Sequence, residues 1–426
     1  MVLWHHRGVR SFAPAVRSVQ STNGRRQRMP SIAAVTEIGS AVARTSAAIV
    51  YEKITRPRPT TLDQVPPSPS ALTTEWLTAA LCAGTPGARV EGFTLGSKND
   101  GTSARRTLEV TYNAAGGAAG LPTHLFTKSS PTLLTRLVTT TANLLPSEHA
   151  FYSAIRRELN IEAPTGFYAA WDPRSNRSLF IIDDVTRTRG AKTDTILTRH
   201  FSREQAEDAI DLLATLHAAY WDRPGLARRF GWLMDPYSWQ LRINKLMMMD
   251  RNAVVGFDRS EHVMPREIYL RKHDFIGALL RSRQISADGP RTIVHSDVHA
   301  GNWYLTGDGR VGLFDWQCML HGFGAQDIAY ALIGNLTIEH RRAWERDLVE
   351  LYRERLRERG ATDVPDSETL WLRYRQMVPH AMFMWLGTIG ANKMQPQMQK
   401  REISLANIER SAQACADLDA FGALGM

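Results

Sequence analysis

Five stretches between residues 90 and 184 have the composition and spacing of β-strands. In the second of them, Leu108, Val110 and Tyr112 alternate with polar residues, which is typical of a strand with one buried face. The segment DPRSNR between the last two stretches is rich in turn-forming residues and predicts a hairpin. One helix, residues 147–159, is expected between the third strand and the fourth. The five predicted strands are residues 90–95, 107–112, 124–128, 166–171 and 178–184.

After residue 185 the apolar positions recur at the three- and four-residue steps of amphipathic helices. Ser202 and Gln205 have the spacing of a capping box, and apolar residues follow at helical spacing as far as residue 220. A similar pattern over residues 344–356 predicts another helix, which Gly360 closes. Short strands are expected around residues 292–314. The pattern therefore predicts an α+β chain, with a small five-stranded lobe followed by a large, mainly helical one.

The chain before the first strand divides into two parts. Residues 1–60 comprise a basic arm that we expect to be disordered, a possible amphipathic helix at 31–55 and the start of a proline-rich linker. A short helix capped by Thr73 or Thr74 then opens the first lobe. We therefore predict a strand-rich lobe over residues 61–184 and a helical lobe over residues 185–426.

The net charge of +9 is concentrated at the N-terminus, because residues 1–28 hold six arginines and no acidic residue. The remaining chain carries only +3, without a recognisable nucleic-acid-binding motif, so we expect no nucleic-acid partner. The arm resembles a transit peptide, but Met29 as the true start is a second interpretation. Nucleic-acid binding by the arm is a third, and it predicts a steep salt dependence that is lost when residues 1–28 are deleted.

The remaining bulk features point to a cytoplasmic protein. The sequence has no apolar run of about 18 residues or more, so we expect no membrane span. Its three cysteines, Cys82, Cys318 and Cys415, lie far apart and suggest buried free thiols in a reducing compartment.

The segment IVHSDVHAGNWYL, residues 293–305, holds an unusual concentration of polar groups. Asp297 and Asn302 lie five residues apart, and Asp315 follows inside the apolar stretch VGLFDW. Phosphoryl transfer needs a carboxylate that orients the attacking hydroxyl, and hard oxygen ligands for Mg²⁺. The order H-S-D-V-H-A-G-N and then F-D-W follows the logic of the kinase pattern H-x-D-x-x-x-x-N and D-F-G. The sequence therefore points to phosphoryl transfer.

The segments HSDVHAGNWY, GLFDWQ and QDIAY resemble those of the aminoglycoside phosphotransferase and choline kinase superfamily, over roughly residues 70–400. LATLHAAYW and EHAFY are most similar to its ecdysteroid-kinase-like branch. The resemblance implies a bilobal, protein-kinase-like fold with an antiparallel sheet in the N-lobe. It also implies an ATP- and Mg²⁺-dependent kinase that phosphorylates a hydroxyl of a small molecule.

Each functional residue is carried over by its place in these motifs. Asp297 becomes the catalytic base, Asn302 and Asp315 become the magnesium ligands, and Asp327 braces the catalytic loop. The nucleotide-binding residues that the resemblance implies are Gly101, Thr102 and Ser103 over the phosphates, Lys128 with its partner Glu148, and Asp183 and Asp184 where the lobes join.

Other residues near these motifs have structural interpretations. We expect His295 to be a packing anchor, His217 a core histidine, His299 structural rather than substrate-facing, and the methionine clusters at 247–249 and 382/384 core filling. Ser296 stands where the family usually has Gly, which is tolerated unless the position needs a positive φ. The loop at 96–103 lacks G-x-G-x-x-G, and Trp316 replaces the Gly of D-F-G.

The acceptor pocket is expected beside the catalytic loop in the helical lobe. Its aromatic content and few acidic clusters favour a fairly apolar alcohol, although sterol-like, lipid-like, sugar and aminoglycoside acceptors stay open. ATP and GTP are not distinguished by these residues. The candidate wall residues are Trp303, Tyr304, Trp316 and Trp385.

Two hypotheses of other classes use the same residues. A catalytically silent nucleotide-binding or scaffold protein on this fold would bind ATP without turnover. A metal hydrolase would instead use His295, Asp297, His299 and Asp315 as a mixed ligand set.

Overall fold

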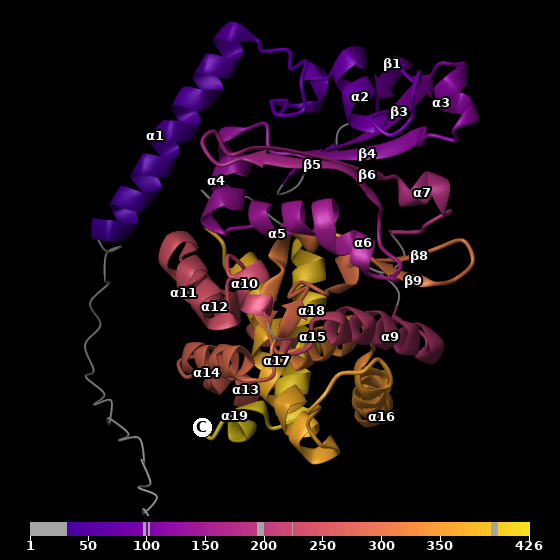
Figure 1. Cartoon of the computed structure of the whole chain (residues 1–426). Helices are drawn as coiled ribbons and strands as arrows, with labels where there is room; N and C mark the ends of the chain where they lie inside the picture. The colour runs from indigo at the N-terminus through magenta and orange to yellow at the C-terminus, as the bar shows by residue number, and fades with distance from the viewer. Residues whose placement is uncertain (1–31, 97–98, 101–102, 194–199, 224, 393–398) are drawn as a thin grey trace, which may run out of the picture.

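An antiparallel sheet in the order β1–β3–β4–β6–β5 forms the N-terminal lobe (Figure 1). The computed structural model describes residues 32–96, 99–100, 103–193, 200–223, 225–392 and 399–426. All five predicted strands are present, and a two-residue strand that was not expected, β2, pairs with β3. The strands are β1 (Val90–Leu95), β2 (Asn99–Asp100), β3 (Ala104–Tyr112), β4 (His124–Ser129), β5 (Gly166–Asp172) and β6 (Arg177–Asp183).

The two faces of this sheet have different roles. Leu108, Val110 and Leu125 belong to a buried cluster on one face, together with Trp76 of α2 (Thr74–Leu81). Thr73 caps α2 by accepting a hydrogen bond from the Trp76 backbone N–H, as one of the two expected caps. Because side chains alternate along a strand, the intervening residues of β3 and β4 face the other lobe. That second face is the one available for a site.

A helical segment lies between the sheet and the helical lobe (Figure 1). It runs through α5 (Leu145–Ala150), a π-helical turn (Phe151–Ile155) and α6 (Arg156–Glu158), where the sequence predicted a single helix over 147–159. The Phe151 ring stacks on that of Trp316 at a centroid distance of 3.8 Å. This stack joins the two lobes through one core.

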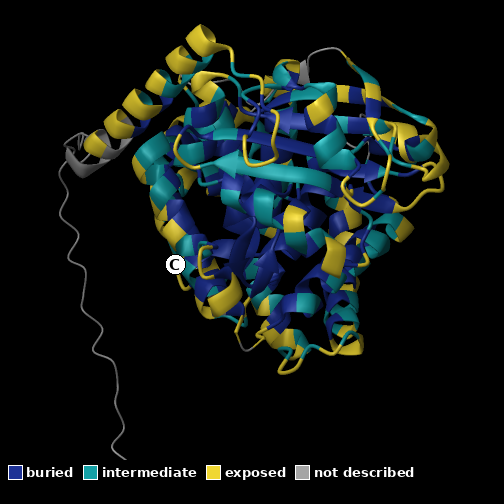
Figure 2. Cartoon of the chain, turned by 45° about the horizontal axis from the view of Figure 1, so that its top comes forward, coloured by how far each residue is buried: buried dark blue, intermediate teal, exposed yellow. Residues whose placement is uncertain are grey.

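The C-terminal lobe is helical and its interior is buried throughout (Figure 2). The capping box at Ser202 and Gln205 is confirmed at the start of α9, and Gly360 has a φ of 83° directly after α16 and its cap. Among the described residues, none of the helices is long and apolar enough to span a membrane. The longer helices are α9 (Arg203–Tyr220), α11 (Pro236–Met247), α12 (Met249–Ser260), α14 (Phe275–Asp288), α15 (Ala325–Asn335), α16 (Ile338–Glu358), α17 (Ser367–Ile389) and α18 (Arg401–Asp417).

Shorter helical elements connect these parts of the fold. In the N-terminal part they are η1 (Pro69–Ala71), α3 (Ala114–Ala118), α4 (Leu133–Thr141) and α7 (Val185–Thr188). In the helical lobe they are α10 (Leu226–Phe230), η3 (Glu261–Val263), α13 (Arg266–Leu270) and α19 (Ala420–Ala423).

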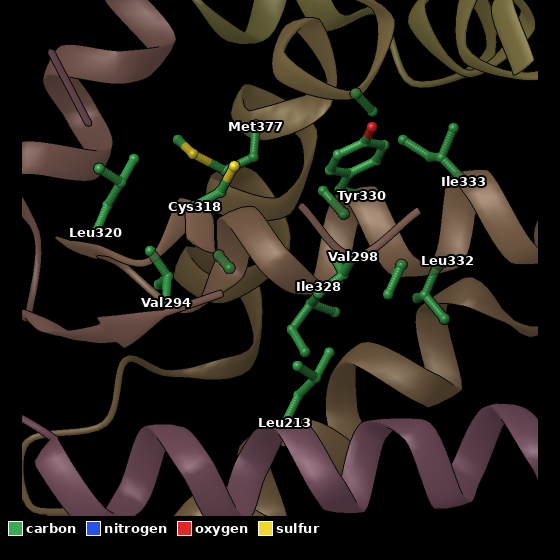
Figure 3. Close-up of a cluster of buried hydrophobic side chains, with 14 of the residues drawn as sticks. Leu213, Val294, Val298, Cys318, Leu320, Ile328, Tyr330, Leu332, Ile333 and Met377 are labelled. Atoms are coloured by element: carbon green, nitrogen blue, oxygen red, sulfur yellow. The ribbon is translucent and has the colours of Figure 1, made fainter. Parts of the chain in front are cut away.

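Four three-residue strands hold the segment that carries the polar motifs. They form two small antiparallel pairs, β7 with β10 and β8 with β9. Behind them, side chains from β7, α9, α15 and α17 form a dense apolar cluster, so the motif segment rests on a rigid base (Figure 3). These strands are β7 (Thr292–Val294), β8 (Trp303–Leu305), β9 (Val311–Leu313) and β10 (Leu320–Gly322).

The predicted N-terminal helix is confirmed as α1 (Ile32–Thr55), which lies beside α4 and the turn between β5 and β6 (Figure 1). Glu52 on α1 makes a two-pronged ion pair with Arg136 of α4, at 2.9 and 2.6 Å. Arg136 is fully buried and also donates to the carbonyls of Ser130 and Ser175. This contact fixes α1 to the N-lobe.

Candidate functional site

The loop after β7 is held by one buried carboxylate. Asp327 accepts hydrogen bonds from the backbone N–H groups of His295 at 2.6 Å and Ser296 at 2.8 Å. Its Oδ2 also lies 3.3 Å from Nε2 of His217, whose Nδ1 lies 2.8 Å from the Tyr352 hydroxyl. His217 is therefore a core histidine with a partner at each ring nitrogen, as expected, and Asp327 contacts the loop backbone.

Ser296 adopts a left-handed conformation, with a φ of 67°. From the sequence, Ser is expected to be tolerated at this position unless a positive φ is required, and the structure does require one. Three contacts hold the strained residue. Its N–H donates to Asp327, its carbonyl accepts from His380 at 3.0 Å, and its hydroxyl accepts from Gln326 at 2.9 Å. The next residue, Asp297, lines a cavity that extends into the helical lobe.

Asp297 and Asn302 meet across the loop. The Asn302 Nδ2 donates to the Asp297 carbonyl at 2.7 Å and to its carboxylate at 3.2 Å. The Asn302 amide oxygen is therefore the atom left to face a cation. His299 accepts from the Gly301 N–H at Nδ1, so its Nε2 carries the proton and lies 3.7 Å from the Asp297 carboxylate. Burial raises the pKa of Asp297, although His299 and His295 partly oppose that shift.

Asp315 lies opposite, after β9, with a φ of 65°. Lys128 of β4 contacts it at 2.6 Å and contacts Glu148 of α5 at 2.7 Å, and the Gln317 side-chain oxygen lies 3.3 Å from the same ammonium. Burial alone would raise the pKa of Asp315, but Lys128 and Arg105 outweigh it and lower the pKa to about 2. Burial keeps the pKa of Glu148 raised in spite of Lys128. Asp315 is therefore a firmly ionised carboxylate.

Two adjoining cavities meet at these residues. One, of about 340 Å³, lies under the sheet and includes Lys128 and Glu148. The other, of about 480 Å³, extends into the helical lobe and includes Asp297 and Asn302. Asp315 lines both. A recess that holds Lys128 and Arg105 together with four acidic side chains therefore adjoins a cavity that holds Asp297, a half-buried carboxylate with a raised pKa.

The other residues that were expected to bind the nucleotide differ in what their side chains contact. Asp183 and Asp184 line the smaller cavity, but their carboxylates serve the fold. Asp183 pairs with Arg189 at 2.6 Å, and Asp184 caps α7. Ser103 is buried, and its hydroxyl has no hydrogen-bond partner in the described part of the chain. Gly101 and Thr102 lie outside the described residues.

The expected aromatic walls need correction. Trp303, Tyr304 and Trp316 are fully buried in the core and do not line the larger cavity, whereas Trp385 does. Their indole and phenol groups bond to protein oxygens, such as the Val298 carbonyl for Trp303. They occupy strand and turn positions that face inward, which composition alone does not reveal.

The methionine prediction holds only in part, because some of these side chains belong to the cavity rather than to the core alone. Met382 is core, as expected. Met247, Met249 and Met384 line the larger cavity.

Arg105 and Gln317 were not predicted as site residues, yet both contact the cluster around Asp315. Arg105 on β3 stands opposite Lys128 on β4 in the strand register, and its guanidinium lies 3.4 Å from Asp315. Arg105 lies outside the strand predicted over residues 107–112, and the register that pairs it with Lys128 is not readable from one sequence. Gln317 belonged to the quoted GLFDWQ motif and was available there.

The metal-hydrolase hypothesis conflicts with the position of His295. Its Nδ1 accepts from the Asp297 N–H at 3.2 Å and its Nε2 contacts the Phe314 carbonyl at 3.1 Å, so both ring nitrogens are engaged. In the described residues, no group of three or more His, Cys, Asp or Glu side chains is placed to hold a metal ion. His295 is a packing anchor, as expected.

Several solved structures are similar at low identity. A microcompartment-associated aminopropanol kinase aligns over 78% of this chain and 92% of its own, with 15% identity and a TM-score of 0.47. A macrolide 2'-phosphotransferase type I aligns over 80% and 95%, with 14% identity and a TM-score of 0.39. The ADP-bound aminoglycoside phosphotransferase APH(2'')-Ib aligns over 77% and 94%, with 13% identity and a TM-score of 0.40.

The family assignment does not rest on those structures. No curated protein sequence matches the chain. The sequence does match the model of the family described as "Phosphotransferase enzyme family", APH, over residues 122–370, which is more than half of its 426 residues. This match confirms the resemblance at the level of the family. The chain therefore belongs to the phosphotransferase enzyme family.

Proposed function

We propose that this protein transfers the γ-phosphoryl group of ATP, with Mg²⁺, to a hydroxyl of a small molecule. The observation that carries the proposal is the meeting of two cavities at Asp315, with Lys128 and Glu148 on one side and Asp297 and Asn302 on the other. Transfer between two bound molecules requires such adjoining recesses, since catalysis here consists mainly of positioning and charge neutralisation.

Asp297 has the surroundings of a catalytic base. The acceptor hydroxyl oxygen bonds to the γ-phosphorus as the bond from that phosphorus to the β–γ bridging oxygen breaks. ADP leaves, and the hydroxyl proton passes to the Asp297 carboxylate. The raised pKa of Asp297 favours proton acceptance, and Asn302 holds the residue by donating one hydrogen bond to its backbone carbonyl and one to its carboxylate.

The donor set fits Mg²⁺. The amide oxygen of Asn302 and the carboxylate of Asp315 are hard oxygen ligands, and Mg²⁺ commonly takes one or two protein oxygens together with waters and phosphate. Both residues line the same cavity. Bound there, Mg²⁺ would neutralise phosphate charge.

The nucleotide would lie in the smaller cavity. Lys128 supplies a cation held by Glu148. The buried hydroxyl of Ser103, which has no hydrogen-bond partner among the described residues, is suited to a phosphate contact. We keep Gly101 and Thr102 as proposed phosphate contacts. Since the carboxylates of Asp183 and Asp184 are engaged, we propose that this segment contributes backbone groups to the base.

The larger cavity favours an apolar alcohol as acceptor. Its described wall is rich in Met, Trp and branched aliphatic side chains from α11, α12 and α17, and its acidic members are Asp297 and Asp315. A polycationic acceptor would need more carboxylates. We therefore propose an acceptor with a large apolar surface and place the chain in the ecdysteroid-kinase-like branch. The three buried free cysteines suit a cytoplasmic location.

Thermal unfolding of the full chain with ATP, with and without Mg²⁺, tests the nucleotide site. A ligand at 100 times its dissociation constant stabilises the native state by about 2.7 kcal/mol. We expect a Mg²⁺-dependent rise in Tm in the wild type that Asp315→Asn loses and Asp297→Asn keeps. A well-folded wild type with no shift would refute the proposal.

A turnover assay separates a kinase from a silent nucleotide-binding protein. ADP release is measured with panels of sterol-like, lipid-like, sugar and aminoglycoside alcohols, and GTP is tested beside ATP. We expect product from the wild type with an apolar alcohol and almost none from Asp297→Asn. Nucleotide binding without product from any panel would favour the silent protein instead.

A further inference from the structure

Four described residues line both cavities: Arg105, Thr193, Phe314 and Asp315. The group that is transferred must pass from the nucleotide cavity to the acceptor cavity, so its path crosses this shared wall. The γ-phosphoryl group is anionic, and Arg105 is the cation among these four residues. Arg105 lines both cavities, whereas Lys128 lines the nucleotide cavity and not the acceptor cavity.

The hydrogen bonds of the two cations also differ. The Lys128 ammonium has three N–H donors, and Glu148, Asp315 and Gln317 provide three acceptors within 3.3 Å. The Arg105 guanidinium has five N–H donors, and its one described side-chain hydrogen bond is to Asp315 at 3.4 Å. The three donors of Lys128 each have a protein acceptor in this structure, whereas the described hydrogen bonds of Arg105 leave donors for a further oxygen-rich partner.

The exposure of Arg105 and its place in the strand register leave its guanidinium accessible to a ligand in the cavity. Its side chain remains 31% exposed, against 7% for Lys128, so it reaches the cavity instead of being enclosed. The strand register sets it directly opposite Lys128, and paired residues of neighbouring strands point to the same face. Its planar fork suits two phosphate oxygens at once.

We propose that Arg105 is a further catalytic residue, which binds the γ-phosphate of the nucleotide and stabilises that group during transfer. The inference rests on the proposed function and deepens it. The acceptor oxygen bonds to the γ-phosphorus while the bond to the β–γ bridging oxygen breaks. The guanidinium donates hydrogen bonds to the non-bridging oxygens throughout and exchanges no atoms.

The test compares a diphosphate with a triphosphate. Dissociation constants for ADP and for a non-hydrolysable ATP analogue, each with Mg²⁺, are measured by calorimetry on the full chain. The wild type should bind the analogue about 10-fold more tightly than ADP, a difference of about 1.4 kcal/mol. Arg105→Gln should lose this preference and still bind ADP as the wild type does, and Arg105→Lys should keep part of it.

Arg106 provides a matched control. It is the next residue of β3 and therefore points to the opposite face of the sheet. Arg106→Gln removes the same charge from the same strand and should leave both dissociation constants unchanged. With an acceptor in hand, Arg105→Gln should lower kcat about 100-fold, as loss of one preorganised transition-state donor does.

The measured dissociation constants separate a failure of the proposed function from a failure of the inference about Arg105. If the wild type binds neither nucleotide, the proposed function fails and the inference fails with it. If the wild type binds both equally, or if Arg105→Gln keeps the preference, the inference is overturned while the proposed function stands. If Arg105→Gln weakens both nucleotides equally, Arg105 positions Asp315 and does not contact the γ-phosphate.

Discussion

Asp297 and Asp315 are half-buried carboxylates in one cavity, yet their pKa values shift in opposite directions. Burial opposes ionisation of both, but Lys128 and Arg105 outweigh it at Asp315, whereas the histidines beside Asp297 do not. One carboxylate therefore stays anionic and suits a cation, and the other has more affinity for a proton. Divergent pKa values of this kind mark a division of roles.

The raised pKa of Asp297 predicts that kcat/KM falls on the acid side of the pH profile. The base must be ionised, so kcat/KM falls as pH drops through this pKa, which lies above the ordinary value of 3.8. Asp297→Asn should lower kcat by about 100-fold or more with little change in nucleotide affinity. A pH profile of kcat/KM, with nucleotide binding followed over the same range, measures both. An acid limb at or below the ordinary value would contradict this role.

Ser296 permits a prediction on backbone strain. Ser296→Ala keeps the left-handed φ of 67° and removes the acceptor for Gln326, whereas Ser296→Gly also removes the acceptor but relieves the strain. We expect the Gly variant to be more stable than the Ala variant by about 1 kcal/mol. Urea unfolding of the two variants measures the difference. Equal stabilities would show that the loop carries no strain at this residue.

At the scale of elements, the sequence predicted the strands and helices that have a regular apolar period or a capping motif. The alternation in residues 107–112 and the capping box at Ser202 each specify local structure, and both are confirmed. Helix α4, in contrast, was missed because its sequence LLTRLVTTT is rich in β-branched residues, which favour strands. It forms through the capping box of Thr132 and Thr135 and through burial of Arg136 against α1, a contact between distant segments.

The pair of Glu52 and Arg136 predicts how firmly α1 is attached. Removing one partner leaves a buried charge without compensation, so Glu52→Ala should destabilise the protein by about 3 kcal/mol. Glu91→Ala removes the acidic partner of an exposed ion pair with Arg89. It should lower the free energy of unfolding by less than about 1 kcal/mol. Urea unfolding of both variants makes the comparison. A small loss for Glu52→Ala would mean that α1 is held mainly by its apolar face.

For the whole molecule, the two-lobe division at residue 184 came from the change of period along the sequence. That division remains a proposal, and the core does not follow it. One buried cluster includes Phe151, Tyr152 and Phe180 together with the interior of the helical lobe. The motifs predicted five residues that the structure places on the walls of the two cavities: Lys128, Glu148, Asp297, Asn302 and Asp315. The position of Arg105 and the other cavity walls depended on strand register and packing, which one sequence does not encode locally.

Because this core crosses the boundary, we expect both lobes to unfold in one transition. Circular dichroism and tryptophan fluorescence should give the same urea midpoint. Phe151→Ala removes the ring that stacks on Trp316, so it should lower the free energy of unfolding by about 3 kcal/mol and leave the transition single. Tyr51→Ala, at an exposed aromatic on α1, is the control and should change it by less than about 0.5 kcal/mol. Two separate transitions would instead show that the N-terminal lobe is stable by itself and that the Phe151 stack is only a docking contact.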